Sequence, residues 1–316
     1  MSLSLKTGAP ASPPEAPASP RRSKRRPADR PLWLMLPMIA LLVLVIVVPF
    51  LIALYISLLD LDQYTLREWV HAPWVGLGNY VESIRTSSAL HSLWVSTSFS
   101  VLTTILITPM GLLAALSVNA RFRGRAVVRS LFLVPYVIPS FVTATVWRII
   151  MQPEGRLNAV LGTLGIDGGQ WLIGEQSFWA LVIVDVWAAW PFLYIMILAG
   201  LQNISADLYD SADVDGASWW QKVWYVVIPQ VRGQLMLGLL LSTLHHFNNF
   251  TLPFVLLGSP APEAALTLPV NIYQTSFHVF RFGLGAAMSV LTLVIMTIPA
   301  VMYIRASKLD AKPQEA

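Results

Sequence analysis

The sequence contains no cysteine and few charged residues. Without cysteine, disulfide bonds, thiolate metal sites and cysteine nucleophiles are all excluded. Charged residues make up only 12% of the 316 residues, whereas about a quarter of a soluble domain is charged. Hydrophobic residues make up 55%, and the mean hydropathy is +0.62. This composition excludes a soluble globular domain and also a disordered or collagen-like chain.

Sequence motifs of catalysis are missing as well. No G-x-x-x-x-G-K-[ST] sequence is present, so the chain is not expected to bind the phosphates of ATP itself. The H-E-x-x-H motif of zinc proteases and the G-x-S-x-G motif of hydrolases are also absent. We therefore expect no catalytic residue, no metal site and no cofactor bound by this chain.

The apolar residues are gathered in long blocks that contain almost no charge. A membrane-spanning helix needs about 20 apolar residues. Lipid offers the backbone no hydrogen-bond partners, so only helices or closed barrels cross it, and the blocks lack the alternation of barrel strands. The sequence therefore predicts an all-α membrane protein with six transmembrane helices, near residues 32–58, 92–117, 127–150, 177–202, 234–256 and 284–305.

The distribution of Lys and Arg predicts how this bundle is oriented. Sixteen of the 21 basic residues lie on the side that would hold both termini and the 203–232 loop. By the positive-inside rule, both termini are cytoplasmic in a multi-pass protein of the cell (inner) membrane. Residues 1–30 are predicted to be a disordered basic tail, 31–306 the transmembrane domain and 307–316 a second cytoplasmic tail. This topology explains the basic run at 21–26 without nucleic-acid binding.

The predicted cytoplasmic loop between the fourth and fifth helices is unusually acidic, with four aspartates in its first half. Ser205 is placed to cap a short helix that begins near Ala206. Gly216 is expected to end that helix, and Pro229 to make a second break. The segment 205–230 thus reads as two short helices lying along the membrane surface. An interfacial connector and a docking element for a cytosolic protein both fit this shape.

Within this loop, residues 210–229, DSADVDGASWWQKVWYVVIP, resemble the coupling motif of binding-protein-dependent ABC importer permeases. The family pattern reads E-A-A, three residues, G, nine residues and I-x-L-P, and the spacing is the same here. The resemblance implies that this segment couples the permease to its ATPase. The residues expected to do so are Asp210, Ser211, Ala212, Asp215, Gly216, Ala217, Val226, Ile228 and Pro229.

Other segments resemble the carbohydrate branch of these permeases, the maltose and glycerol-phosphate type. The resemblance covers about 75–305 and implies the type I ABC importer permease fold and import of a sugar or polyol by alternating access. It implies as partners a second permease in a heterodimer, two ATP-binding subunits that use ATP and Mg, and an extracytoplasmic solute-binding protein. The segments are VGLGNY (75–80), RSLFLVPYVIPS (129–140), FNNF (247–250), TLPVNIYQTSF (267–277) and FGLGAAMSV (282–290).

Polar side chains inside the predicted helices are the candidates for a solute path. His245, Asn248 and Asn249 are spaced to share one face of the fifth helix, which is expected to line a water-filled path or to form interhelical hydrogen bonds. Asn248 and Asn249 belong to FNNF, which by resemblance implies proximity to the sugar. The remaining candidates, whose aromatic members also suit core packing, are Trp187, Trp190, Tyr194 and Ser289.

Asp185 is the one acidic residue within the fourth predicted helix, and a buried carboxylate there is costly. We expect a structural pair with Arg148, while a proton relay and a contact with solute stay open. A rival reading is an ion-coupled secondary transporter in which Asp185 and His245 carry protons. It needs no ATPase and leaves the spacing of 210–229 unexplained. A scaffold without a solute path is the third alternative.

Overall fold

A computed structural model describes residues 35–85, 87–120 and 122–310, and in these residues every regular element is a helix. The predicted tail at 1–30 and the last part of the predicted tail at 307–316 lie outside the described residues. The chain divides into two compact units, Met1–Pro49 and Phe50–Ala316, which are described separately.

The described part of the first unit is helical throughout. Helix α1 (Leu36–Leu42) is followed by a π-helical turn, η2 (Val43–Val47), and by α2 (Val48–Ile56), which continues into the second unit. These elements form one candidate membrane span, Leu36–Ile56, without a single charged residue. A helix that is apolar on all sides is typical of a membrane span. The predicted first helix, near 32–58, is confirmed over Leu36–Ile56, while its predicted start at 32–34 lies outside the described residues.

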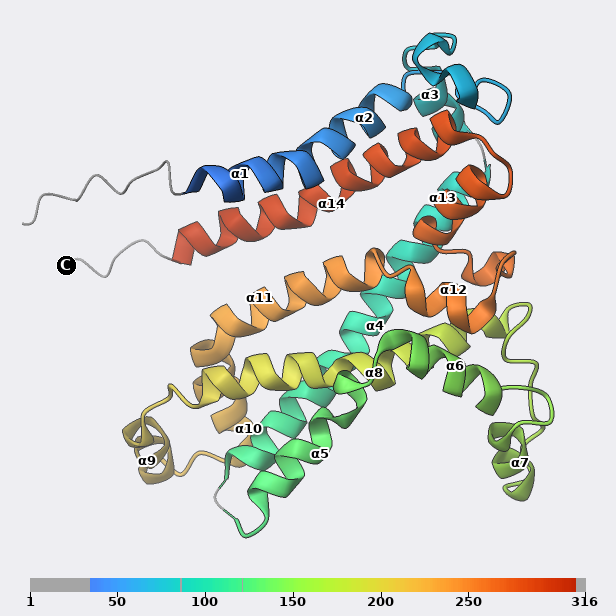
Figure 1. Ribbon diagram of the computed structural model, residues 1–316. Helices are drawn as coiled ribbons and strands as arrows, with labels where there is room; N and C mark the ends of the chain where they lie inside the picture. The colour runs from blue at the N-terminus through green and yellow to red at the C-terminus, as the bar shows by residue number, and fades with distance from the viewer. Residues whose placement is uncertain (1–34, 86, 121, 311–316) are drawn as a thin grey trace, which may run out of the picture. The chain divides into compact units, whose positions relative to one another are not determined.

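The second unit contains four further long helices (Figure 1). Together with Leu36–Ile56 they make five spans among the described residues, and a sixth if one bent pair counts as a span. Three of the four agree with the second, fourth and sixth predicted helices to within a few residues. The four are α4 (Ser87–Asn119), α8 (Gln176–Leu201), α14 (Phe282–Asp310) and the continuous helix Trp219–Phe247, formed by α10 (Trp219–Lys222), η4 (Val223–Val227) and α11 (Ile228–Phe247).

The third predicted helix is broken. In place of one helix over 127–150, α5 (Arg125–Val137) and α6 (Ser140–Ile150) meet at 85°. Ile138 and Pro139 between them are extended, with ψ of 128° and 136°. A proline lacks the N–H of a helical hydrogen bond and biases the residue before it toward extended backbone. Pro139 therefore accounts for the break.

The fifth predicted helix, 234–256, is wrong at both ends. The helix starts well before residue 234 and ends at Phe247, where Asn248 has φ −91° and ψ 3°. A separate short helix, α12 (Thr251–Leu257), follows. The path of the chain therefore bends at the polar residues that the sequence placed inside a helix.

Short helices fill the connections. Figure 1 shows α9 and the turn before α5 toward one end of the second unit, and α3, α12 and α7 toward the other. The short elements are η3 (Leu66–His71), α3 (Gly78–Arg85), α7 (Arg156–Thr163), α9 (Ala206–Val214), η5 (Glu263–Ala265) and α13 (Leu268–Phe277).

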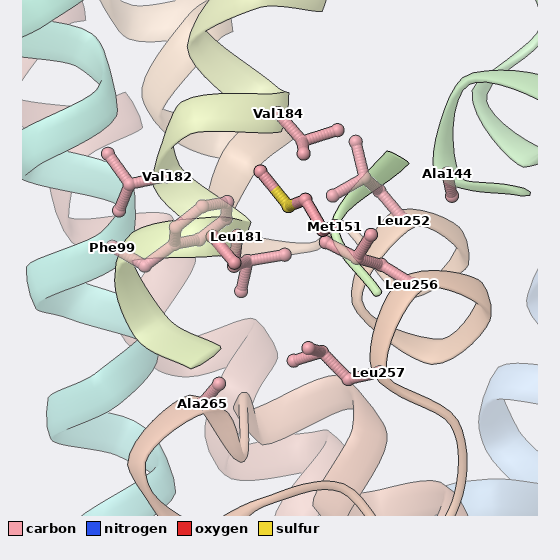
Figure 2. Close-up of a cluster of buried hydrophobic side chains, with 11 residues drawn as sticks. Phe99, Ala144, Met151, Leu181, Val182, Val184, Leu252, Leu256, Leu257 and Ala265 are labelled. Carbon is pink, nitrogen blue, oxygen red and sulfur yellow. The ribbon is translucent and has the colours of Figure 1, made fainter. Parts of the chain in front are cut away.

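Two apolar clusters hold α4, α8 and α11 together, and a third packs α14 against α4, α11 and α13. Figure 2 shows the first, where Phe99 of α4, Leu181 of α8 and Leu252 of α12 surround Met151. The second joins α4, α8 and α11 through buried residues that include Ile107 and Leu193. The first two clusters both use α8, so this helix is the shared centre of their packing.

Small polar residues supply the hydrogen bonds that apolar packing lacks. Along α4, the hydroxyl of Ser96 accepts a 2.7 Å hydrogen bond from the N–H of Leu268, and Ser92 lies 2.9 Å from Nδ2 of Asn271. The hydroxyl of Ser100 donates to the carbonyl of Thr243 at 2.8 Å. Small hydroxyl residues let membrane helices approach closely while satisfying polar groups.

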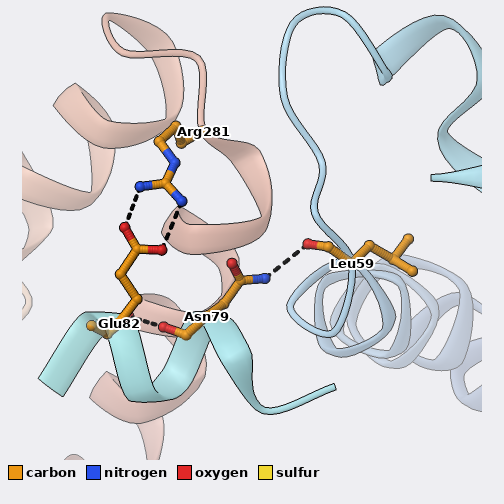
Figure 3. Close-up of polar contacts among 5 residues, drawn as sticks. Leu59, Asn79, Glu82 and Arg281 are labelled. Atoms are coloured by element: carbon orange, nitrogen blue, oxygen red, sulfur yellow. Dashed lines mark hydrogen bonds and ion pairs between the residues drawn. The ribbon is translucent and has the colours of Figure 1, made fainter. Parts of the chain in front are cut away.

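The connection between α2 and α4 is tied to the start of α14 by polar contacts (Figure 3). Asn79 of α3 donates to the carbonyls of Ser57 and Leu59 at 2.9 and 2.8 Å. Both carboxylate oxygens of Glu82 bind the guanidinium of Arg281, one at 2.7 Å. This hydrogen bonding by Arg281 lowers the pKa of Glu82 below its ordinary value. The fork-like geometry fixes the orientation of α3 relative to the segment before α14.

Gly111 marks the closest approach of α4 and α8. A Cβ on Gly111 would lie 2.9 Å from both the Cβ of Leu193 and the backbone nitrogen of Tyr194. We predict that Gly111→Ala lowers stability by about 1–3 kcal/mol, the usual cost of overpacking a core. Gly233→Ala in α11 is the matched control, because nothing lies within 4 Å of its Cβ position. Thermal unfolding in detergent measures both; equal melting temperatures for the two variants would contradict the prediction.

Candidate functional site

The helix α9 begins where the sequence predicted, at Ala206, with Ser205 at its N-cap position. The Ser205 side chain makes no capping hydrogen bond; its carbonyl accepts a bond from the N–H of Leu208 at 3.3 Å. Asp207 lies in the first turn, where a negative charge interacts favourably with the helix dipole. The start of the helix is thus confirmed, while its predicted side-chain cap is wrong.

Gly216 ends α9, as predicted. Its φ of +69° is the left-handed conformation that glycine adopts without strain. The N–H of Ala217 binds the carbonyl of Ala212 at 2.9 Å, and the N–H of Gly216 binds that of Asp213 at 3.1 Å. These two bonds form a Schellman motif, which satisfies the last carbonyls of a helix. The turn after α9 is therefore fixed by its backbone.

The predicted second break at Pro229 is wrong. Ser218 caps α10 in a capping box with Gln221, and the helix then runs without interruption to Phe247. Pro229 lies in the first turn of α11, directly after the π-helical turn η4. The wider turn accommodates the missing N–H, so the helix continues. The segment 205–230 is one short helix followed by the start of a long one, rather than two surface helices.

We call residues 205–230 the coupling segment. Ala212 is buried, and Tyr209 packs against the cluster that joins α4, α8 and α11. The opposite side of α9 exposes Asp210 and Val214, the latter 88% exposed. An ion pair between Lys222 and Asp213 connects α10 to α9. One side of α9 is therefore anchored to the bundle, and the other presents acidic and apolar side chains.

The predicted coupling residues fall into two groups. Six lie on α9 and in the turn after it, and three lie where the long helix passes from η4 into α11. The first group is Asp210, Ser211, Ala212, Asp215, Gly216 and Ala217, and the second is Val226, Ile228 and Pro229.

Further along the same helices lies a cavity of about 600 Å³. Its walls come from the break between α5 and α6, from the middle of α8, and from the end of α11 with the bend that follows. Lining side chains include Asp185, Phe192, Ser242, His246 and Asn249. The α5–α6 break, the middle of α8 and the end of α11 therefore meet at one cavity. The sequence alone did not predict that these three segments are neighbours.

Asp185 pairs with His246, and the predicted pair with Arg148 is wrong. Oδ2 of Asp185 lies 2.6 Å from Nδ1 of His246, and each residue is only 2% exposed. Arg148 instead donates to the carbonyl of Val255 at 3.3 Å. A carboxylate buried among membrane helices requires such a partner. Sequence reasoning missed His246 because the rotation of the fifth helix, which decides whether His245 or His246 faces α8, was undetermined.

Asn249 joins the bend after α11 to this pair. Its Nδ2 donates a long hydrogen bond of 3.5 Å to Oδ1 of Asp185, and its Oδ1 accepts one of 3.2 Å from the N–H of Leu252. The same side chain therefore contacts α8 and the first turn of α12. Through Asn249, Asp185 of α8 is therefore linked to the bend after α11 and to the start of α12.

Several polar atoms of the cavity lining are buried without a hydrogen-bond partner among the described residues. Besides Oδ2 of Asp185 and Nδ1 of His246, which contact each other as an ion pair without hydrogen-bond geometry, they are the hydroxyl oxygens of Thr143 and Ser242 and Nε2 of His246. A buried polar group that forms no hydrogen bond costs free energy. These atoms have almost no accessible surface, so they are closed to the cavity in this conformation.

The other predicted solute-path residues are divided between this cavity and other places. His245 lines the cavity with Asn249. Asn248 donates to the carbonyl of Leu244 at 2.9 Å and lines, with Ser289, a second cavity of about 400 Å³. Because α11 ends at Phe247, the predicted common helical face of His245, Asn248 and Asn249 is not formed.

The three aromatic candidates pack against other rings. Trp187 lies against Trp147, with ring centroids 5.8 Å apart. Trp190 and Tyr194 lie 5.4 and 5.7 Å from Phe132 in edge-on arrangements. None of the three is among the residues that line the 600 Å³ cavity. These contacts agree with core packing, the alternative to a place on the solute path that the sequence left open for these three residues.

Comparison with known proteins covers nearly the whole chain. Residues 107–312 match the family described as "Binding-protein-dependent transport system inner membrane component". The trehalose/maltose transport system permease protein MalF of Thermococcus litoralis is 31% identical over 287 residues, which are 90% of this chain and 96% of that protein. The sn-glycerol-3-phosphate transport system permease protein UgpA of Agrobacterium fabrum is 29% identical over 268 residues, 84% of this chain and 90% of that protein.

A solved structure shares the fold. A bacterial ABC transporter involved in the import of the acidic polysaccharide alginate superposes with a TM-score of 0.76, at 22% identity, over 89% of this chain and 96% of its own. The expected all-α, type I ABC importer permease fold is confirmed. By the family match and by its identity to the permease of T. litoralis, this chain belongs to the binding-protein-dependent transport system inner membrane components.

Proposed function

We propose that this chain is one permease subunit of an ATP-driven importer that moves a sugar or polyol across the cell (inner) membrane. One observation carries the proposal: α8 and the helix Trp219–Phe247 both line the 600 Å³ cavity, and the coupling segment joins the two. A displacement of that segment would therefore act directly on two walls of the cavity. The names of relatives, which include trehalose, maltose and glycerol phosphate transport systems, support a carbohydrate-type solute.

The proposed partners are inferred from the missing ATP-binding motif of this chain and from the exposed side of α9. ATP and Mg would be used by two ATP-binding subunits, one of which docks on the exposed side of α9. A second permease, in a heterodimer, would complete the solute path, and an extracytoplasmic binding protein would deliver the solute. For the alginate importer, a complex with a periplasmic protein carrying an alginate pentasaccharide is known. Surrounding lipid covers the apolar outer surface.

In the proposed orientation the coupling segment and both termini are cytoplasmic. The start of α5 is on the same side and contributes Arg125 and Arg129, and Arg123 lies just before it. Basic residues concentrate on the cytoplasmic side of membrane proteins, which supports this assignment. The connections at 57–85, 151–175 and 258–281 would then face the outside, where the binding protein docks.

Transport would proceed by alternating access. ATP binding closes the ATPase pair and moves the coupling segments of both permeases. The cavity then opens outward, receives solute and, after hydrolysis, opens to the cytoplasm. Coupling of this kind requires contacts that differ between the two states, because a ligand shifts an equilibrium only by its differential affinity. The bends at Pro139 and at Asn248–Phe250, both beside the cavity, are the places where the walls would change direction.

The rival reading, a secondary transporter with Asp185 and His245 as proton carriers, is less well supported. Asp185 contacts His246 rather than His245, and it also binds Asn249. Family membership favours an ATP-driven system with separate ATPase subunits.

The docking role predicts a specific sensitivity at Gly216. Gly216→Val places a β-branched residue at a φ of +69°, where L residues are strained by roughly 1–2 kcal/mol. The turn after α9 would shift, and we expect affinity for the ATPase subunits and uptake to fall about tenfold, which corresponds to ~1.4 kcal/mol.

The control for this variant is Gly216→Asn. Asparagine tolerates the left-handed conformation, and the Cβ position of Gly216 has nothing within 4 Å. Asparagine should therefore preserve docking. Co-purification of the ATPase subunits and uptake in proteoliposomes measure both variants. If valine binds the ATPase and transports as well as asparagine does, the docking role is refuted.

The solute path predicts different roles for two adjacent asparagines. Asn249→Ala removes the contact between Asp185 and the bend after α11, and hydrogen bonds to charged groups are worth roughly 1.5–3 kcal/mol. We expect uptake to fall about tenfold or more while assembly with the partner subunits is kept. Asn248→Ala, the adjacent control, changes a side chain that bonds its own helix and lies outside this cavity. Equal transport rates in the two variants would contradict the assignment of the path.

A further inference from the structure

We infer that the cavity selects an uncharged, hydroxyl-rich solute and that Asp185, held by His246, is the residue that rejects anionic ones. The inference rests on the proposed function and deepens it. Names of relatives leave this point open, because they include both neutral sugars and an anionic glycerol phosphate.

The first argument is the charge of the cavity walls. Lysine and arginine are absent from the side chains that line the cavity, whereas Asp185 contributes a carboxylate. His246 faces this carboxylate directly, so a proton on its imidazole would be balanced within the pair. His245 is the other lining imidazole. The lining therefore holds no side chain with a permanent positive charge.

The second argument is the supply of hydrogen bonds. Thr143, Ser242 and His246 line the cavity, and their hydroxyls and Nε2 form no hydrogen bond among the described residues. These atoms are closed to solvent in this conformation and would become available to a solute when the walls rearrange; each hydroxyl can then donate and accept. The hydroxyl groups of a solute have the same dual capacity and match these sites in any orientation. A phosphate, sulfonate or carboxylate only accepts, and its recognition normally uses Arg, Lys or several backbone N–H groups.

The third argument is the low dielectric of the site. Asp185 is 2% exposed and lies in the interior of a membrane-spanning helix, so its charge is weakly screened. An anion entering the cavity loses water and meets the Asp185 carboxylate, with no Lys or Arg in the lining to bind it. A neutral sugar meets neither cost. The charge of the solute, rather than its size, is therefore what this wall distinguishes.

The test measures solute binding by the assembled transporter in detergent, without its binding protein, so that only the membrane subunits select. At pH 8, thermal unfolding is followed against increasing trehalose and maltose, their 6-phosphates, glycerol and sn-glycerol 3-phosphate. A ligand that binds only the folded state stabilises it by RT ln(1 + [L]/Kd), so the rise in melting temperature with concentration measures its Kd. We expect at least one neutral probe to bind at least tenfold more tightly than its phosphorylated counterpart.

Two variants assign the discrimination to the wall charge. Asp185→Asn keeps shape and hydrogen bonding but removes the charge, and should lower the preference for the neutral probe about tenfold. His245→Lys leaves the Asp185–His246 pair intact and adds a cation to the lining. It should also lower the preference for the neutral probe about tenfold. This second variant keeps the test valid if Asp185→Asn does not fold. Ser242→Ala should weaken neutral binding without improving binding of the phosphate.

The inference is overturned if the wild type binds a phosphorylated probe as tightly as its neutral counterpart, if no neutral probe binds, or if both charge variants leave the preference unchanged. Its failure is distinct from failure of the proposed function. ATP-dependent uptake of an anionic sugar would retain the importer and refute only the selectivity. Uptake that does not need the ATPase would refute the importer itself.

Discussion

The contact between Asp185 and His246 is the interaction on which the arrangement of the cavity depends. It joins α8 to α11 with both side chains buried, and Asn249 extends it to the first turn of α12. Lipid cannot solvate a carboxylate, so the helices must supply its partners. The same requirement that orients these helices also gathers polar groups at one hollow. Under the proposed function, the side chains that hold these helices together would also be the ones that meet the solute.

Force from outside the membrane would reach this hollow by a short route. The coupling segment is held by local hydrogen bonds and by helix continuity. It has a Schellman motif at Gly216, a capping box at Ser218 and an uninterrupted helix to Phe247. At its other end α9 continues from α8 through a turn of a few residues. Only the turn at 215–218 separates α9 from the long helix that lines the cavity.

Much of this could be predicted from the sequence, and the reasons for the failures are physical. Long uncharged blocks fix the spans because the bilayer core sets a length, and the turn at Gly216 follows from local backbone chemistry. Helix rotation depends on tertiary packing, so the choice of His246 over Arg148 as the partner of Asp185 was not predictable. The break at Pro139 and the continuation through Pro229 also depend on neighbours: the same residue type ends one helix and, next to a π-helical turn, is tolerated in another.

The most direct test of the account asks whether the cavity changes sides with the nucleotide state. The chain has no cysteine, so Ala189→Cys introduces a single thiol in the cavity lining. In vesicles of defined orientation that hold the whole transporter, a membrane-impermeant maleimide should label it from the cytoplasmic side without ATP. With a non-hydrolysable ATP analogue and the binding protein present, labelling should come from the outer side. Labelling from the same side in both states would contradict alternating access through this cavity.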